Sequence, residues 1–589
     1  MSDFLQTGPA ISNTFTSDKL LQSLLQRFIP TQHWPQVQTD LQRLGARAAG
    51  DLLRFAEDAE QNPPWHRPFS PWGERLDEIV TAPGWQSLND ASAEEGFVAS
   101  GYERRYGEFS RLYQFAGIYL FHPSSAFYTC PLAMTDGAAR LIECHGDEDL
   151  KARVLPRLIS RDPATFWTSG QWMTEKTGGS DISNTETIAR FQNGQWRLYG
   201  SKWFTSAIGT QMTMTLARIE DEQGNQVAGS RGLSLFYLEV HDETGRLNGI
   251  EILRLKDKLG TKALPTAELR LNGTVAKMVG GHGEGVKTIA TLFNVTRIYN
   301  ACTTMGAWRR LLDLALDYAG KRVAFNKPLL QHPLHFRQLA EISVQFHACF
   351  HLAMYVTLLL GREEVPDNDP DPQATRALLR LMTPIAKLYC AKKNMIATSE
   401  LIESFGGAGF IEDTGLPKWL RDNQVLTIWE GTTNVLSLDV LRAIKTEQAL
   451  PQFIRTVRDR LQALSAQATS ATFSDAPLAD TPLLDTENTA LDIENTAFHI
   501  ESAKQITEAL KHLEHYQDLM PKLASEELEY NARDLAFSLG NIMAALLLLE
   551  HACALPDDEQ AAIIAQQFCG SSLYVITPAT ELHLKHLKI

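Results

Sequence analysis

The spacing of apolar residues changes period twice along this chain of 589 residues, and that change restricts the possible folds more than any other feature. From about residue 166 to 285 the sequence is rich in Thr, Gly and Trp, with short alternating runs such as WRLYGSKWFTS and LSLFYLEV. Alternation with period two is typical of half-buried strands joined by tight turns. Helical spacing precedes this segment and returns after it. We therefore predict an α+β protein, mostly α, with a small β domain between helical domains.

The same change of period divides the chain into four parts. We predict an N-terminal helical domain with an extension over residues 1–165, a middle β domain over 166–285, a helical domain over 286–446 and an extra helical unit over 447–589. Residues 465–490 are poor in bulky apolar residues and rich in Ser, Thr, Asp and Ala, which predicts a linker or a long surface loop. The strip NPPWHRPFSPWGERL, residues 62–76, holds four prolines, so we expect a loop packed over another surface.

Charge and composition argue against several classes of protein. The net charge of −15 is unfavourable for general binding to nucleic acids. Residues 447–589 hold nine Lys and Arg against 21 Asp and Glu, a net charge of −12, and such a unit repels phosphates. The run IMAALLLL, residues 542–549, is far shorter than the roughly 20 residues that span a bilayer, so we predict a buried helix and no membrane association.

The cysteines and the N-terminus indicate a cytoplasmic protein. The seven cysteines are scattered and no CxxC occurs, which is typical of reduced thiols and of neither a disulfide frame nor a zinc site. The first residues lack the basic and apolar regions of a leader peptide.

His347 and His351 stand one helical turn apart, a spacing that can bind a metal. No third ligand is evident nearby, so we predict no metal and expect both histidines to be packed inside the protein or at an interface.

A lone carboxylate, Glu430, stands between a tryptophan and a glycine in TIWEGTTNVL, residues 427–436. One interpretation is that Glu430 caps a helix starting at the threonines. The other is that Glu430 is a general base, because desolvation in an apolar, tryptophan-flanked pocket raises the pKa of a carboxylate toward neutrality. Gly431 would then let the chain turn closely past a ligand.

A second segment, QWMTEKTGGSDISNTET at residues 171–187, combines adjacent glycines with several hydroxyls. Backbone N–H groups and short hydroxyl side chains in such a turn can bind an anionic or heteroaromatic ligand. In the later SKWFTS, Trp203 and Thr205 are two residues apart, so alternation along a strand predicts that they share a face. A flat aromatic ring beside a hydroxyl suits a flat ligand.

Several motifs, in one order, resemble those of the acyl-CoA dehydrogenase family over about residues 95–445. MTEKTGGSD resembles the flavin-binding signature, KWFTS the second flavin strand and LKDKLGTKALPTAEL the end of the β domain. GKRVAFNKPLLQHPLHFRQLAEI and LIESFGGAGF resemble the helical segments that bind the ADP half of FAD. LPKWLRDNQVLTIWEGTTNV resembles the segment that carries the catalytic base. The long N-terminal part and the phrases MTEK-GGSD and IWEG are most similar to the AidB-like branch.

The resemblance implies an N-terminal helical domain, a middle β barrel and a C-terminal four-helix domain, with FAD between them and the extra helical unit added. It assigns Glu430 as the catalytic base and Ser180, Arg297 and Gly431 to the substrate. The positions that it assigns to FAD are Gln171, Met173, Thr174, Gly179, Ser180, Trp203, Thr205, Arg322, Gly406, Gly407 and Asn434. The chain departs from the family pattern at Asn294, Asn326 and Pro333, where aspartate, glycine and glutamine are usual.

The implied reaction is the FAD-dependent oxidation of an acyl-CoA in fatty acid metabolism. Glu430 would remove the α-proton, the enolate oxygen would be held by its backbone N–H and a ribityl hydroxyl of FAD, and the β-hydride would pass to flavin N5, giving trans-2-enoyl-CoA. The family suggests an electron-transfer flavoprotein as acceptor and a homodimer or homotetramer. Two alternatives stay open: an AidB-like flavoprotein of the alkylation response associated with nucleic acid, and a regulatory flavoprotein that binds acyl-CoA with little turnover.

Overall fold

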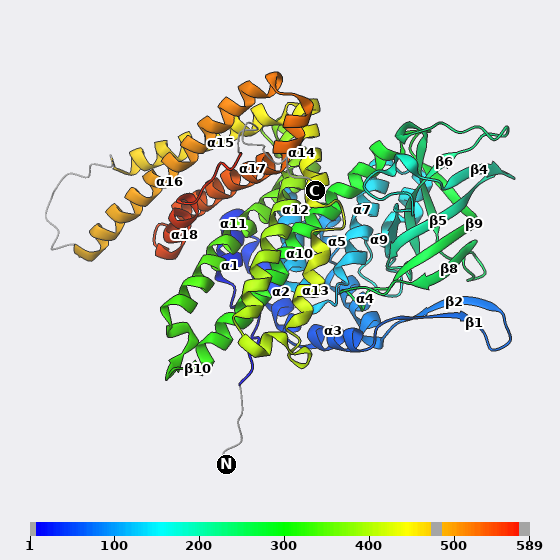
Figure 1. Cartoon of the computed structure of the whole chain (residues 1–589), viewed down its shortest axis with the longest axis horizontal. Helices are drawn as coiled ribbons and strands as arrows, with labels where there is room; N and C mark the ends of the chain where they lie inside the picture. Colours follow the sequence, from blue (N-terminus) through cyan, green and yellow to red (C-terminus); the bar gives the residue numbers. More distant parts are fainter. Residues whose placement is uncertain (1–6, 473–485, 577–589) are drawn as a thin grey trace, which may run out of the picture.

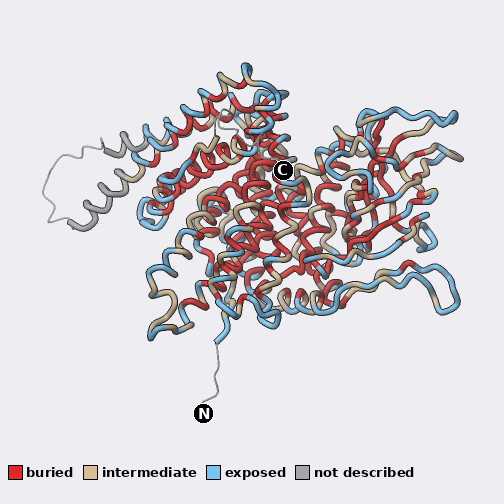
Figure 2. Tube along the Cα trace, in the orientation of Figure 1, coloured by how far each residue is buried: buried red, intermediate tan, exposed pale blue. Residues whose placement is uncertain are grey.

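The computed structural model describes residues 7–472 and 486–576 and shows three bodies side by side (Figure 1). A helical body occupies the centre, a β barrel lies on one side of it, and the long helices of the C-terminal unit lie on the other (Figure 1). This is the α+β, mostly α architecture predicted from the sequence. Figure 2 shows that the buried residues run continuously through the central helices and into the barrel.

The N-terminal part is helical except for one hairpin. Its helices form one apolar core with the central helices that follow the barrel. The elements are α1 (Lys19–Phe28), α2 (Trp34–Ala48), α3 (Asp51–Gln61), β1 (Trp65–Phe69), β2 (Arg75–Val80), α4 (Pro83–Glu95), α5 (Ala99–Glu103), α6 (Ser110–Phe121), α7 (Thr129–His145), α8 (Glu148–Arg153) and α9 (Leu155–Leu158).

The proline-rich strip predicted as a loop is the hairpin of β1 and β2, which runs along one edge of the barrel (Figure 1). Pro68 stands within β1, which is possible because β1 pairs with β2 alone and is therefore an edge strand. Strand β2 contacts the barrel: the Asp77 carboxylate accepts a hydrogen bond from the backbone N–H of Ile252 at 3.0 Å. The expected loop conformation is wrong, and most of the strip is exposed instead of packed over another surface, with Trp65 50% and Trp72 94% exposed.

The middle part contains seven strands, five of which close into a barrel. The order β6–β4–β5–β9–β7 returns to β6, while β3 pairs parallel with β6 and β8 pairs with β9. Trp172, Leu198 and Phe236 fill the interior. The strands are β3 (Ser169–Trp172), β4 (Ile188–Gln192), β5 (Gln195–Ser206), β6 (Met212–Ile219), β7 (Leu233–Glu239), β8 (Ile250–Leu255) and β9 (Thr266–Val279).

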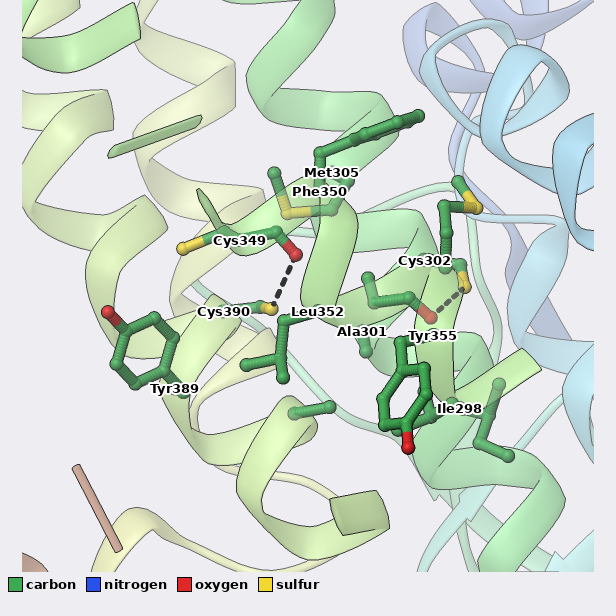
Figure 3. Close-up of a cluster of buried hydrophobic side chains, with 14 of the residues drawn as sticks. Ile298, Ala301, Cys302, Met305, Cys349, Phe350, Leu352, Tyr355, Tyr389 and Cys390 are labelled. Carbon is green, nitrogen blue, oxygen red and sulfur yellow. Dashed lines mark hydrogen bonds between the residues drawn. The ribbon is translucent and has the colours of Figure 1, made fainter. Parts of the chain in front are cut away.

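Four helices, α10, α11, α12 and α14, make the central body. Figure 3 shows apolar side chains of α10, α11 and α12 that meet between them, including Met305, Phe350 and Tyr389. The elements are α10 (Gly285–Lys321), β10 (Val323–Ala324), β11 (Lys327–Pro328), α11 (Pro333–Glu364), α12 (Pro372–Glu403), α13 (Pro417–Leu426) and α14 (Thr433–Glu447).

Two of the departures from the family pattern fit their local backbone. Asn326, in the turn between β10 and β11, has φ +65°, a left-handed conformation that glycine adopts freely and that asparagine tolerates better than most residues. Pro333 is the first residue of α11, where the missing N–H of proline costs no helical hydrogen bond.

The C-terminal unit consists of α15 (Ala449–Thr472), α16 (Thr486–Leu519), α17 (Ser525–Ala554) and α18 (Glu559–Cys569). Every residue of the run 542–549 in α17 is buried, which confirms the predicted buried helix. The predicted linker 465–490 is wrong where the structure describes it, because α15 continues through Thr472 and α16 begins at Thr486. Alanine, four of the ten residues 463–472, favours helix. The rest of that prediction, 473–485, lies outside the described residues.

Helix α17 attaches this unit to the central body. The Tyr389 hydroxyl on α12 donates a 2.7 Å hydrogen bond to Asn541, and Glu550 forms ion pairs with Arg27 and Arg460. Among the described residues, α11 and α17 are long and apolar enough to cross a membrane by length and composition. Their most apolar windows are 78% and 89% buried, as in core helices of a folded domain.

Candidate active site

Glu430 stands in a strained turn between α13 and α14. Its backbone has φ +59°, a left-handed conformation that is unfavourable for a residue with a Cβ, and Gly431 follows with φ +107°. A Cβ on Gly431 would lie 2.8 Å from the Leu436 side chain, so only glycine fits there. Strain of this kind persists only where the surroundings enforce it, and it is common at functional sites.

Two side chains from other elements hold the Glu430 carboxylate. The Thr296 hydroxyl on α10 donates to one oxygen at 2.7 Å, and the Gln171 amide on β3 donates to the other at 3.2 Å. Burial raises the pKa of Glu430, and this effect outweighs the hydrogen bonds and the nearby positive charges of Arg297 and Lys387, which lower it. A carboxylate whose pKa is raised toward neutrality is a suitable general base.

The helix-cap interpretation of Glu430 is wrong. Thr432, which precedes the first residue of α14, is the N-cap of that helix, and it makes no side-chain capping bond. The Glu430 carboxylate points instead to Thr296 and Gln171.

Charged residues of α10, α12 and α14 contact this turn or one another. The Arg297 guanidinium donates to the Glu430 carbonyl at 3.4 Å and pairs with Asp439 at 2.8 Å, and Asp439 also pairs with Arg380. The ammonium of Lys387 donates to the Gly431 carbonyl at 2.7 Å. Arg297 therefore lies beside the predicted base, as expected. Its hydrogen bond is to the backbone of the turn that carries Glu430.

The predicted flavin loop follows β3. Met173 is buried against the barrel, while Gly179 and Ser180 are exposed and Thr174 is half-buried. A Cβ on Gly179 would lie 3.1 Å from the Thr174 side chain, so a larger residue would crowd the hydroxyl. The loop is tied to the next flavin segment because the Trp203 backbone N–H donates to the Thr174 carbonyl at 2.9 Å.

Trp203 and Thr205 do not follow simple alternation. The register of β5 against β9 shifts between Lys202 and Thr205, as in a β-bulge, and both of these side chains are buried. The Thr205 hydroxyl donates to the Ala267 carbonyl at 2.7 Å. Trp203 is partly exposed, and the ammonium of Lys256 lies 3.2 Å from its ring centroid. The sequence gives no sign of the bulge.

Arg322, Gly406 and Gly407 lie together, as the resemblance implies, and line a cavity of about 740 Å³ at the C-terminal end of α10. A Cβ on either glycine would meet no atom within 4 Å, so this wall of the cavity is open. The cavity is remote from Glu430: Thr296 and Arg322 are separated by about 39 Å along α10, at about 1.5 Å per residue. Asn434, also predicted to contact FAD, is exposed in the first turn of α14, close to the base.

The residues around Glu430 fit a flavin. In the described part of the chain, the Gln171 amide oxygen and the Trp429 indole N–H are buried without a hydrogen-bond partner, and both flank Glu430. Buried polar atoms are rarely left unpaired in a complete site, so these two indicate a ligand. The hydroxyls of Thr174 and Ser180 and the partly exposed Trp203 add the donors and the aromatic surface that a flavin needs.

Four contributors to this site were not predicted: Thr296, Lys387, Asp439 and Arg380. Thr296 directly precedes the predicted Arg297, so its place on the same helix was a usable signal. Lys387 stands within the apolar run MTPIAKLYCA, and a lysine in such a run needs a buried partner.

No described group of three or more His, Cys, Asp or Glu side chains has the arrangement of a metal site. His351 is buried and packs against His551 with ring centroids 4.5 Å apart, which agrees with the first of the two positions expected for it, packed inside the protein.

Family models match four parts of the chain. The adaptive response protein AidB N-terminal domain matches residues 8–163, the acyl-CoA dehydrogenase middle domain matches 170–274 and the acyl-CoA dehydrogenase C-terminal domain matches 283–445. Residues 492–586 match the acyl-CoA dehydrogenase 11 C-terminal domain-like family.

Individual proteins agree with these models. Acyl-CoA dehydrogenase family member 11 of Caenorhabditis elegans is 39% identical over 580 residues, covering 96% of this chain and 88% of that protein. The crystal structure of C. elegans ACDH-11 in complex with C11-CoA superposes with a TM-score of 0.88, covering 98% of this chain and 94% of that one. The putative acyl-CoA dehydrogenase AidB of Escherichia coli (strain K12) is 31% identical over 416 residues, covering 69% of this chain and 73% of that protein. The chain therefore belongs to the acyl-CoA dehydrogenase family of FAD-dependent oxidoreductases, in its AidB-like branch.

Proposed function

We propose that the protein oxidises an acyl-CoA thioester to the trans-2-enoyl-CoA, with Glu430 as the base that removes the α-proton. The observation that carries this proposal is the Glu430 carboxylate itself. It is buried enough for its pKa to be raised, and Thr296 and Gln171 hold it in one orientation. A general base requires this combination of a suitable pKa and a fixed position.

The C–H bond at the α-carbon breaks and its proton moves to the Glu430 carboxylate, while the β-carbon loses its hydrogen together with the bonding electron pair. Bound FAD supplies the acceptor for that hydrogen and electron pair. Thr174, Ser180, Trp203 and Gln171 would hold the cofactor beside the base. The Glu430 backbone N–H would stabilise the developing enolate oxygen.

The substrate class rests on a relative. C. elegans ACDH-11, 37% identical over the superposed chains, was crystallised with C11-CoA, an acyl-CoA. We therefore propose an acyl-CoA substrate for this chain and an electron-transfer flavoprotein as the acceptor. We also propose a cytoplasmic location. All seven cysteines lie within the described residues and are free thiols, which supports this location.

We further propose a homodimer or homotetramer. The cavity lined by Arg322, Gly406 and Gly407 lies about 39 Å along α10 from Thr296, farther than one FAD molecule spans. If this cavity holds the ADP half of FAD, that FAD belongs to the site of a second chain. Apolar residues beside the cavity are highly exposed in one chain: Phe325 is 92% exposed and Phe410 is 88% exposed. Exposed apolar surface of this kind marks an interface.

Nucleic acid binding, suggested by the likeness to AidB, is a weaker candidate. The net charge of −12 over residues 447–589 opposes binding to a phosphate backbone. A regulatory protein that binds acyl-CoA without turnover is the other alternative, and kinetics separate it from a dehydrogenase.

The test is the anaerobic visible spectrum of the FAD-loaded protein while acyl-CoAs of several chain lengths are added. The wild-type flavin band should bleach with the preferred chain length. Glu430→Gln should slow this bleaching by about 10²- to 10⁴-fold, the usual contribution of a positioned base. Glu148→Gln, an exposed carboxylate on α8, is the control and should bleach as the wild type does. A wild-type protein that binds acyl-CoA but never bleaches would favour the regulatory alternative.

A further inference from the structure

Lys387 is a completely buried lysine that the proposed function does not use. It lies on α12 between Ala386 and Leu388, with no exposed surface, and its ammonium donates to the Gly431 carbonyl at 2.7 Å. An ammonium group buried among apolar residues is strongly unfavourable unless a specific interaction requires it. The interaction at this position is with the turn that carries the base.

That turn is held on both sides by cations. The Glu430 carbonyl accepts from Arg297 on α10, and the Gly431 carbonyl accepts from Lys387 on α12. Glu430 at φ +59° and Gly431 at φ +107° are both left-handed, a conformation that a glutamate leaves readily when nothing holds it. The two hydrogen bonds therefore connect the strained turn to two long helices of the central body.

The same lysine acts on the charge of the base. Burial lowers the pKa of Lys387 to about 7, and the negative charge of Glu430 opposes this shift. In return, the positive charge of Lys387 lowers the pKa of Glu430 against the larger effect of burial. Lys387 therefore affects both the position of the carboxylate and its protonation.

We propose that Lys387 is a positioning residue for the base: by binding the Gly431 carbonyl it keeps the Glu430–Gly431 turn left-handed and aims the Glu430 carboxylate at the substrate. This inference rests on the proposed function of Glu430 as the base. Lys387 contacts the backbone of the turn, not the substrate, so its loss should change the chemical step more than binding.

The first experiment is stopped-flow reduction of the FAD-loaded full chain by acyl-CoA in Lys387→Met, as a function of pH. The limiting rate of flavin reduction should fall about 100-fold, the effect expected of a displacement near 1 Å, with little change in acyl-CoA affinity. The acid limb of the pH profile should move to higher pH, because the positive charge that lowers the pKa of Glu430 is gone.

The matched control is Arg310→Met. Arg310 is also a buried cation, its guanidinium donates to the Ser124 hydroxyl, and it lies on α10 about 20 Å from Arg297. This variant should keep the wild-type rate and pH profile. An equal loss in Arg310→Met, or a wild-type profile in Lys387→Met, would overturn the proposal. If Lys387→Met does not fold, Lys387→Gln, which is polar but neutral, replaces it with the same expectations.

A second measurement does not need turnover. Infrared titration of the substrate-free protein reports the Glu430 carboxyl, assigned by its absence in Glu430→Gln. The pKa of Glu430 should be higher in the Lys387 variant than in the wild type. An unchanged value in a folded variant would contradict the role of Lys387 whatever the activity. A raised value in a protein whose wild type never reduces flavin would show that Lys387 acts on the Glu430 carboxylate and would contradict the proposed function alone.

Discussion

At the scale of single residues, the Thr296 hydroxyl is the contact with Glu430 whose removal has the clearest consequence. Its hydrogen bond to the carboxylate favours the ionised form and so lowers the pKa of Glu430. In Thr296→Val the pKa of Glu430 should rise, and fewer molecules would carry an ionised base at acid pH. We expect flavin reduction about tenfold slower than in the wild type on the acid side and converging with it at alkaline pH, measured by stopped-flow absorbance.

The matched variant for that experiment is Thr303→Val. Thr303 lies two turns further along α10, is buried, and donates only to carbonyls of its own helix. Its pH profile should coincide with that of the wild type. A tenfold loss at every pH in Thr296→Val would mean that the hydroxyl orients the carboxylate without affecting its ionisation.

At the scale of elements, the contact between α12 and α17 depends on a glycine. A Cβ on Gly540 would lie 2.7 Å from the Tyr389 ring, whose hydroxyl is fixed by Asn541. Gly540→Ala should therefore lower the free energy of unfolding of the C-terminal unit by about 1–3 kcal/mol, as overpacking does. Urea unfolding measures this. Gly570→Ala, where the new Cβ would be 3.4 Å from the nearest atom and φ is −68°, should have little effect.

The contact between α11 and α17, where His351 meets His551, should weaken in acid. Burial lowers the pKa of His551 to about 4 and that of His351 well below its ordinary value. The unfolded chain, with histidine near 6.5, then binds more protons between about pH 6.5 and 4, so stability rises with pH in this window and is lost on acidification. His551→Phe should reduce the slope of unfolding free energy against pH by up to about 1.4 kcal/mol per pH unit. The exposed His515→Phe should leave the slope unchanged.

The sequence predicted the elements better than their local irregularities. The change of period located the barrel, and the apolar run of α17 identified a buried helix, because both signals repeat over many residues. The hairpin β1–β2 was not predicted because its prolines indicate a loop, although proline is also compatible with an edge strand. The bulge at Trp203 depends on the pairing of β5 with β9, residues about 65 positions apart. The motif identified Glu430. Lys387 and Asp439 come close to the turn that carries Glu430 only through tertiary packing.

At the scale of the whole molecule, the exposed apolar residues beside the Arg322 cavity predict an oligomer. Phe410→Asp should place a charge within the proposed interface, dissociate the oligomer and reduce the FAD that copurifies with the chain. Light scattering gives the mass, and the visible absorbance gives the flavin content. Val227→Asp, at an exposed position of the barrel, is the control. A Phe410→Asp variant with the wild-type mass and full flavin content would contradict this arrangement.

Helix α10 joins two chemical regions: Thr296, in its first third, lies beside the base, and Arg322, directly after its last residue, lies beside the cavity. An α-helix turns about 100° for each residue, so one inserted or deleted residue between them would rotate everything beyond it by that angle. Exposed positions of α10 can change their side chains without such an effect. During evolution, this helix should therefore vary in sequence while keeping a constant length.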